Sequence, residues 1–179
     1  MSTPRTFCQS YFELLGLPVS FEVNLSELNQ RYKSLQKEMH PDRFVNNSEH
    51  EQRLSLQYAA FLNEAVATLK SPLKRSHYLL KLKGREVDVE HYTIRDTAYL
   101  MQQMQWRETL EELGGEKNPL VTIEQLQTQV DELLNENSAQ FKQAYETGNL
   151  VMAEEAIHKM HFVYKLQHEL EVAYEKYDS

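Results

Sequence analysis

Pro41 constrains the fold of this 179-residue chain more than any other residue, because it stands between two amphipathic helical patterns. It restricts His40 to extended backbone angles and has no amide hydrogen to donate to the preceding turn. A helix that reaches His40 must therefore end there. Two helices joined by a short polar connection normally pack antiparallel. The sequence thus predicts a helical hairpin with His40, Pro41 and Asp42 in an exposed loop at one tip.

Each helix of this hairpin has a start signal and an apolar stripe. Asn24 with Glu27, and Ser48 with Glu51, have the spacing of capping boxes. Ser71-Pro72 ends the second helix. Apolar residues at three-and-four spacing share one helix face. The stripes are Leu25, Leu28, Tyr32, Leu35 and Met39 in the first helix and Leu54, Tyr58, Phe61, Leu62, Ala65 and Leu69 in the second.

The tip of the hairpin is better suited to binding than to catalysis. His40 and Asp42 flank a rigid proline, with no nucleophile, phosphate cradle or metal-ligand set nearby. Basic residues lead up to the tripeptide and follow it, which favours an acidic protein partner through charge complementarity. These basic residues are Arg31, Lys33, Lys37 and Arg43; a merely solvated basic face is the alternative.

Composition and charge divide the chain into two parts. Five glycines and five prolines favour helix throughout. Residues 1–75 carry nine Lys/Arg and eight Asp/Glu, whereas residues 76–179 carry ten and nineteen, so their net charges are +1 and −9. The acidic second part argues against nucleic-acid binding. Without an apolar run of about 18 residues or a secretory signal in residues 1–10, we expect a cytosolic protein that does not bind membranes.

The second part of the chain predicts a three-helix bundle. A short helix over residues 73–83 should end at Gly84, before a linker over residues 84–92. Gly114-Gly115 and Gly148 then separate three helical patterns. Unequal helices favour an intramolecular bundle and a monomer over a coiled-coil dimer. The expected core is Tyr99, Trp106, Leu110 and Leu113; Ile123, Leu126, Val130, Leu133, Phe141 and Tyr145; and Ala153, Ala156, Met160, Val163, Leu170, Tyr174 and Tyr177.

The first helix of the predicted bundle has a second apolar face. When residues advance by about 100° each, three apolar residues fall opposite the core stripe, among amide and acidic side chains. A methionine-rich patch with a charged rim suits protein binding, although the linker or the hairpin could instead cover it. The patch consists of Leu100, Met101, Met104, Gln105, Glu108 and Glu112, and Phe162 on the last helix is placed to extend it.

Neither a metal nor a cofactor is predicted. Cys8 is the only cysteine and cannot by itself hold zinc or an iron-sulfur cluster. His158 and His161 lie three apart in a predicted helix, but no third ligand is near them in sequence. Packed or solvated histidines are therefore the favoured interpretation.

The hairpin resembles a J-domain. Leu28, Tyr32, Leu35 and the tripeptide match the motif before the loop, and Asn63-Glu64-Ala65, Leu69 and Ser71-Pro72 match the helix after it. The resemblance implies that the tripeptide and the basic helix face engage a DnaK-type chaperone and stimulate its ATP hydrolysis. An accidental match is the alternative, and the agreement of both helices argues against it.

The segment from Thr93 to Met101 resembles the start of the C-terminal domain of the HscB family, J-type co-chaperones of iron-sulfur cluster biogenesis. This resemblance implies an all-α protein with a J-domain at 1–83, a linker at 84–92 and a scaffold-binding bundle at 93–179, in an L-shaped two-domain arrangement. It also implies that the J-domain recruits the chaperone HscA and that the patch binds the scaffold protein IscU. Gln105 departs from the acidic residue common in bacterial relatives.

The same residues leave two alternative functions open. A J-domain co-chaperone for a different client would keep the tripeptide and change only the partner of the bundle. An enzyme using His40 and Asp42 as an acid-base pair would need a substrate pocket that the sequence does not predict.

The absence of a paired-cysteine zinc segment and of an Arg-rich leader favours a bacterial cytoplasmic protein over a mitochondrial one.

Overall fold

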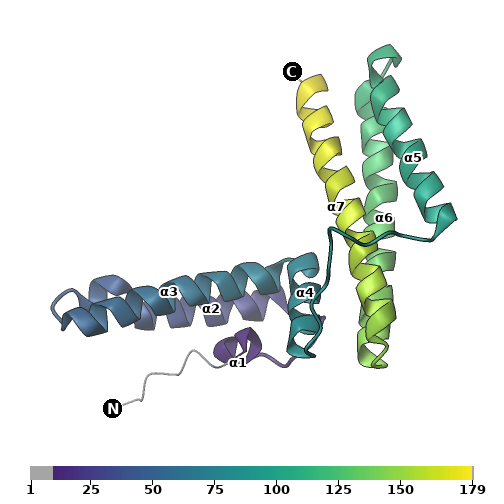
Figure 1. Ribbon diagram of the computed structural model, residues 1–179. Helices are drawn as coiled ribbons and strands as arrows, with labels where there is room; N and C mark the ends of the chain where they lie inside the picture. The colour runs from purple at the N-terminus through teal and green to yellow at the C-terminus, as the bar shows by residue number, and fades with distance from the viewer. Residues whose placement is uncertain (1–9, 179) are drawn as a thin grey trace. The chain divides into compact units, whose positions relative to one another are not determined.

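The computed structural model describes residues 10–178, and Cys8 lies outside them. The chain divides into two compact units, one ending at Leu82 and the next beginning at Lys83 (Figure 1). Within the described residues every regular element is a helix, which confirms the all-α prediction. None of the described helices is both long enough and apolar enough to cross a membrane.

The first unit is built on a helical hairpin. It contains α1 (Tyr11–Leu15), α2 (Leu25–Met39), the 3-10 helix η1 (Pro41–Phe44), α3 (Glu49–Lys70) and α4 (Pro72–Leu82). Helices α2 and α3 lie side by side and η1 connects them (Figure 1). The short α1, which the sequence patterns did not predict, places Phe12 and Leu15 in the core, where both are fully buried.

The predicted capping signals are present with one difference. The Ser48 hydroxyl accepts from the Glu51 amide at 3.3 Å, and the Glu51 carboxylate accepts from the Ser48 amide at 3.1 Å, so this capping box is complete. At α2 the Asn24 side chain accepts from the amides of the next turn, at 3.0 and 3.1 Å. The Glu27 carboxylate instead contacts Arg31 Nη2 at 3.4 Å, so Asn24 alone caps α2.

The apolar stripes of α2 and α3 pack against each other, except at the first position. Leu28, Leu62 and Leu69 are buried as predicted, whereas Leu25 is 49% exposed. Leu25 is the first residue of α2, and burial of the stripe begins one turn later, at Leu28. The Tyr32 hydroxyl donates to Asn63 Oδ1 at 2.9 Å, which links the two helices at a position of the J-domain motif.

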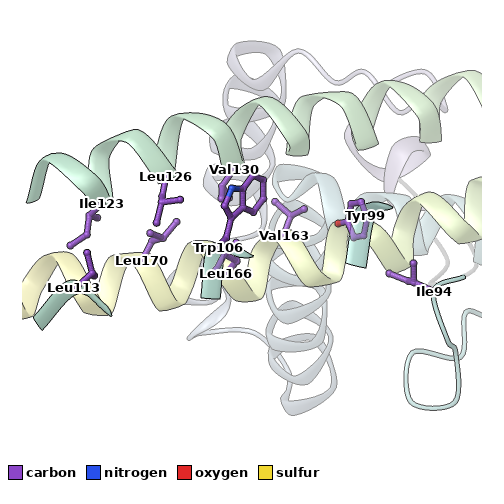
Figure 2. Packing of buried hydrophobic residues seen from close by; sticks show 10 residues of the cluster. All are labelled: Ile94, Tyr99, Trp106, Leu113, Ile123, Leu126, Val130, Val163, Leu166 and Leu170. Carbon is purple, nitrogen blue, oxygen red and sulfur yellow. The ribbon is translucent and has the colours of Figure 1, made fainter. Parts of the chain in front are cut away.

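The second unit is the predicted three-helix bundle. It contains α5 (Thr97–Glu112), the 3-10 helix η2 (Leu113–Gly115), α6 (Pro119–Glu146) and α7 (Leu150–Tyr177). Gly148, with φ of 75°, makes the turn between α6 and α7, and α5 lies alongside this long hairpin (Figure 1). Figure 2 shows the core between the helices: Ile94, Tyr99, Trp106, Leu113, Ile123, Leu126, Val130, Val163, Leu166 and Leu170.

Candidate functional site

The His-Pro-Asp tripeptide forms a tight helical turn where the sequence predicted a loop. His40 ends α2 in an extended conformation, and Pro41 is the first residue of η1. His40 Nδ1 accepts from the Asp42 amide at 3.3 Å and lies 3.5 Å from the Asp42 carboxylate. His40 Nδ1 therefore lies within reach of both the amide and the carboxylate of Asp42. The side chains of His40 and Asp42 are 48% and 85% exposed, which leaves both open to a partner.

The basic residues around the tripeptide lie on two faces. Residues of a helix advance by about 100° each, so Lys33 and Lys37 share the exposed face of α2. Arg43 donates to the backbone carbonyl of Lys37 at 3.1 Å, which holds it beside the end of that helix. Arg31 lies on another face and contacts Glu27. The structure thus places Arg43 and the end of α2 that carries Lys37 beside the tripeptide, and Lys33 lies one turn further back on the same face of α2.

The predicted patch on the first bundle helix is exposed where the methionines stand. Met101 and Met104 are 65% and 63% exposed, so the segment preceding α5 leaves both side chains open. With Gln105 and Glu108 they line an open hollow of about 890 Å³ beside α5. Four of the seven predicted scaffold-binding residues therefore meet in one hollow.

The remaining three residues of the prediction have different surroundings. Leu100 and Phe162 are partly buried and pack against the bundle core. Glu112 is exposed at the end of α5 but does not line the hollow. Glu136 and Gln140 of α6, which sequence reasoning missed, line its opposite wall. Their spacing of four residues indicates a shared helix face, but not which face of α5 it meets.

The segment expected to be a linker is attached to the bundle. Arg85 Nε donates to Glu154 at 2.6 Å, and the Tyr92 ring stacks on His158 with 3.6 Å between ring centroids. Ile94 then enters the bundle core. Residues 84–92 contain no helix, and these contacts join them to α7.

Asp96 fixes the start of α5. Its carboxylate accepts from the Tyr99 amide at 3.1 Å, as the helix cap, and from Lys159 Nζ at 2.9 Å. Both interactions favour the ionised acid and lower the pKa of Asp96, the lysine having the larger effect. The Tyr99 hydroxyl donates to the Lys159 carbonyl at 2.7 Å, and burial raises the pKa of Tyr99 to about 12. The exposed methionines thus stand on a helix whose first turn is held by α7.

We expect the bundle to lose stability as the pH falls from 7.5 to 5.5. His158 is buried, and among the described residues its Nε2 has no hydrogen-bond partner, although Glu154 Oε1 lies 3.8 Å away. Burial lowers the pKa of His158 below the usual value near 6.5, and Glu154 opposes the shift. The unfolded chain therefore binds a proton in this pH range more readily than the folded chain, and unfolding becomes easier at low pH. Burial lowers the pKa of His161 as well.

Urea unfolding followed by fluorescence of Trp106, the only tryptophan, measures this effect in the bundle. His158→Phe should reduce the loss of stability between pH 7.5 and 5.5, whereas His168→Phe, at an exposed histidine of the same helix, should not. If the free energy of unfolding depends on pH equally in the wild type and in His158→Phe, the pH dependence does not come from His158.

Within the described residues no group of three or more His, Cys, Asp or Glu side chains could hold a metal ion.

A helical hairpin with an exposed His-Pro-Asp turn, followed by a three-helix bundle, defines a J-type co-chaperone. The family model described as the HSCB C-terminal oligomerisation domain matches residues 95–171. The co-chaperone protein HscB homolog of Shewanella loihica is 41% identical over 167 residues, covering 92% of this chain and 96% of the relative. That of Aeromonas hydrophila is 43% identical over 162 residues, covering 90% and 94%.

Solved structures agree with the sequence relatives. The chaperone HscB from Vibrio cholerae has a TM-score of 0.85 and 36% identity, covering 93% of this chain and 99% of that chain. The human co-chaperone protein HscB has a TM-score of 0.86 and 27% identity, covering 95% and 84%. The chain therefore belongs to the HscB co-chaperone family.

Proposed function

We propose that this protein stimulates the ATPase of a DnaK-type chaperone, HscA, and delivers the iron-sulfur cluster scaffold protein IscU to it. The observation that carries the proposal is the exposed His40-Pro41-Asp42 turn, in a chain that also presents Met101 and Met104 to solvent. Family membership supports the co-chaperone role. The client and the chaperone are inferred from the family resemblance and from these two surfaces.

Two binding sites on one chain would bring the scaffold and the chaperone together. A scaffold held on the bundle is present at a high effective concentration when the J-domain meets the chaperone. Stimulated ATP hydrolysis would then close the chaperone on the scaffold that the bundle has delivered, which would favour cluster transfer and maturation of iron-sulfur proteins. The protein itself needs neither a nucleotide nor a metal for this role, and it acts in the bacterial cytoplasm as a monomer.

Isothermal titration of the full chain with purified IscU tests the choice of client. We expect saturable binding with one IscU per chain, in the absence of chaperone and nucleotide. Stimulation of HscA without any binding of IscU would contradict the proposal. That result would favour the alternative, a J-domain co-chaperone that delivers a different client protein.

A further inference from the structure

A furrow follows the seam between α5 and α6. Its first part is the hollow of about 890 Å³ between the exposed methionines and the α6 residues Glu136 and Gln140. A second hollow of about 310 Å³ continues along the same two helices. Gln102 and Gln105 line both hollows, so the two are adjacent. We call this combined feature the α5–α6 furrow.

The walls of the α5–α6 furrow are acidic or carry neutral amides. Glu108 of α5 and Glu136 of α6 both line the first hollow. Lys159 is the only basic side chain among the described residues that line the furrow, and it contacts Asp96 at 2.9 Å and Glu155 at 3.6 Å. These carboxylates offset its charge. The furrow therefore favours an occupant with positive charge.

Hydrogen bonds within the bundle fix the floor of the furrow. Trp106 Nε1 donates to Gln129 Oε1 at 2.9 Å. The Tyr99 hydroxyl donates to a backbone carbonyl of α7 and accepts from Asn137 Nδ2 at 3.5 Å. By contrast, the side chains of Gln105 and Gln140 on the walls are exposed. The furrow thus offers a fixed floor and exposed amides, an arrangement that suits a docked peptide segment.

We propose that the scaffold-binding site extends across α5 into the α5–α6 furrow, so that α6 forms its second wall. The occupant is a segment of the scaffold protein whose apolar side chains cover Met101 and Met104. Its basic side chain lies between Glu108 and Glu136. This inference rests on the proposed function, and it adds Glu136 and Gln140 to the contact surface.

Charge substitutions on α6, made in the full chain, test the inference. Glu136→Lys and, separately, Gln140→Lys should each raise the dissociation constant for IscU at least fivefold in a calorimetric titration. The matched controls are Glu124→Lys for the acid and Asn135→Lys for the amide, because both residues are exposed on α6 and neither lines the furrow. Each control changes the net charge as much as its partner variant, so long-range electrostatic attraction to IscU falls equally in both. We expect the dissociation constant of each control for IscU to change less than twofold.

The possible outcomes distinguish failure of the furrow proposal from failure of the proposed function. If Glu136→Lys and Gln140→Lys bind IscU as tightly as their controls, while Met101→Ala with Met104→Ala weakens binding, the furrow proposal is overturned and the client assignment stands. If the wild type fails to bind IscU, both are overturned. Circular dichroism melts of all four lysine variants should match the wild type, because each replaced side chain is exposed.

Discussion

His40→Gln or Asp42→Asn is expected to reduce stimulation of the HscA ATPase to the rate of the chaperone alone. Both side chains are exposed, and they contact each other within the turn: His40 Nδ1 lies beside the amide and the carboxylate of Asp42. Removing a central contact of an interface typically costs about 2 kcal/mol or more. Neither side chain is part of a core, so the helical content and IscU binding should be unchanged. Single-turnover ATP hydrolysis measures the effect.

The same substitution at another exposed histidine provides the control. His168→Gln on α7 replaces a side chain that is 76% exposed and should leave stimulation at the wild-type level. Full stimulation by both tripeptide variants would show that the turn does not drive the chaperone.

Met101→Ala combined with Met104→Ala should weaken IscU binding by about 1 to 4 kcal/mol, the range of interface anchors. At 65% and 63% exposure, these side chains contribute little to the folded bundle, so a loss of affinity would report on the interface. Leu100 and Phe162 are less suitable for this test, because both pack against the core. Calorimetric titration with IscU gives the affinity, and thermal melts check the fold.

Val151→Ala with Met152→Ala is the matched control for the methionine pair. These side chains are 65% and 59% exposed at the start of α7, so the control removes a similar exposed apolar surface elsewhere on the bundle. We expect wild-type affinity for IscU in this variant. If the two double variants lose the same affinity for IscU, Met101 and Met104 do not form a specific binding surface.

Local signals in the sequence were sufficient to predict most of the helices. The Ser48 capping box, Pro41 and the Ser71-Pro72 pair mark boundaries that depend on neighbouring residues alone, and the apolar stripes identified most of both cores. The exposure of Met101 and Met104 followed from the periodicity of one helix. Features that depend on short-range chemistry were therefore predictable.

Features that depend on packing between elements were not predictable in this way. The five-residue α1 is too short to show a periodic pattern, and it is fixed by tertiary contacts of Phe12 and Leu15. Gln103 is polar but only 3% exposed, and within residues 10–178 neither of its amide atoms has a hydrogen-bond partner. The role of α6 as a wall opposite the methionines depends on the register between two helices, which sequence patterns do not contain.

The ATPase rate of HscA with this protein and IscU, added separately and together, tests the central claim most directly. If one chain both delivers the scaffold and triggers the chaperone, the rate with both should exceed the sum of the increases that each causes alone. Met101→Ala with Met104→Ala should remove this excess and leave the stimulation by the co-chaperone alone unchanged. Purely additive stimulation by the wild-type protein and IscU would contradict the account.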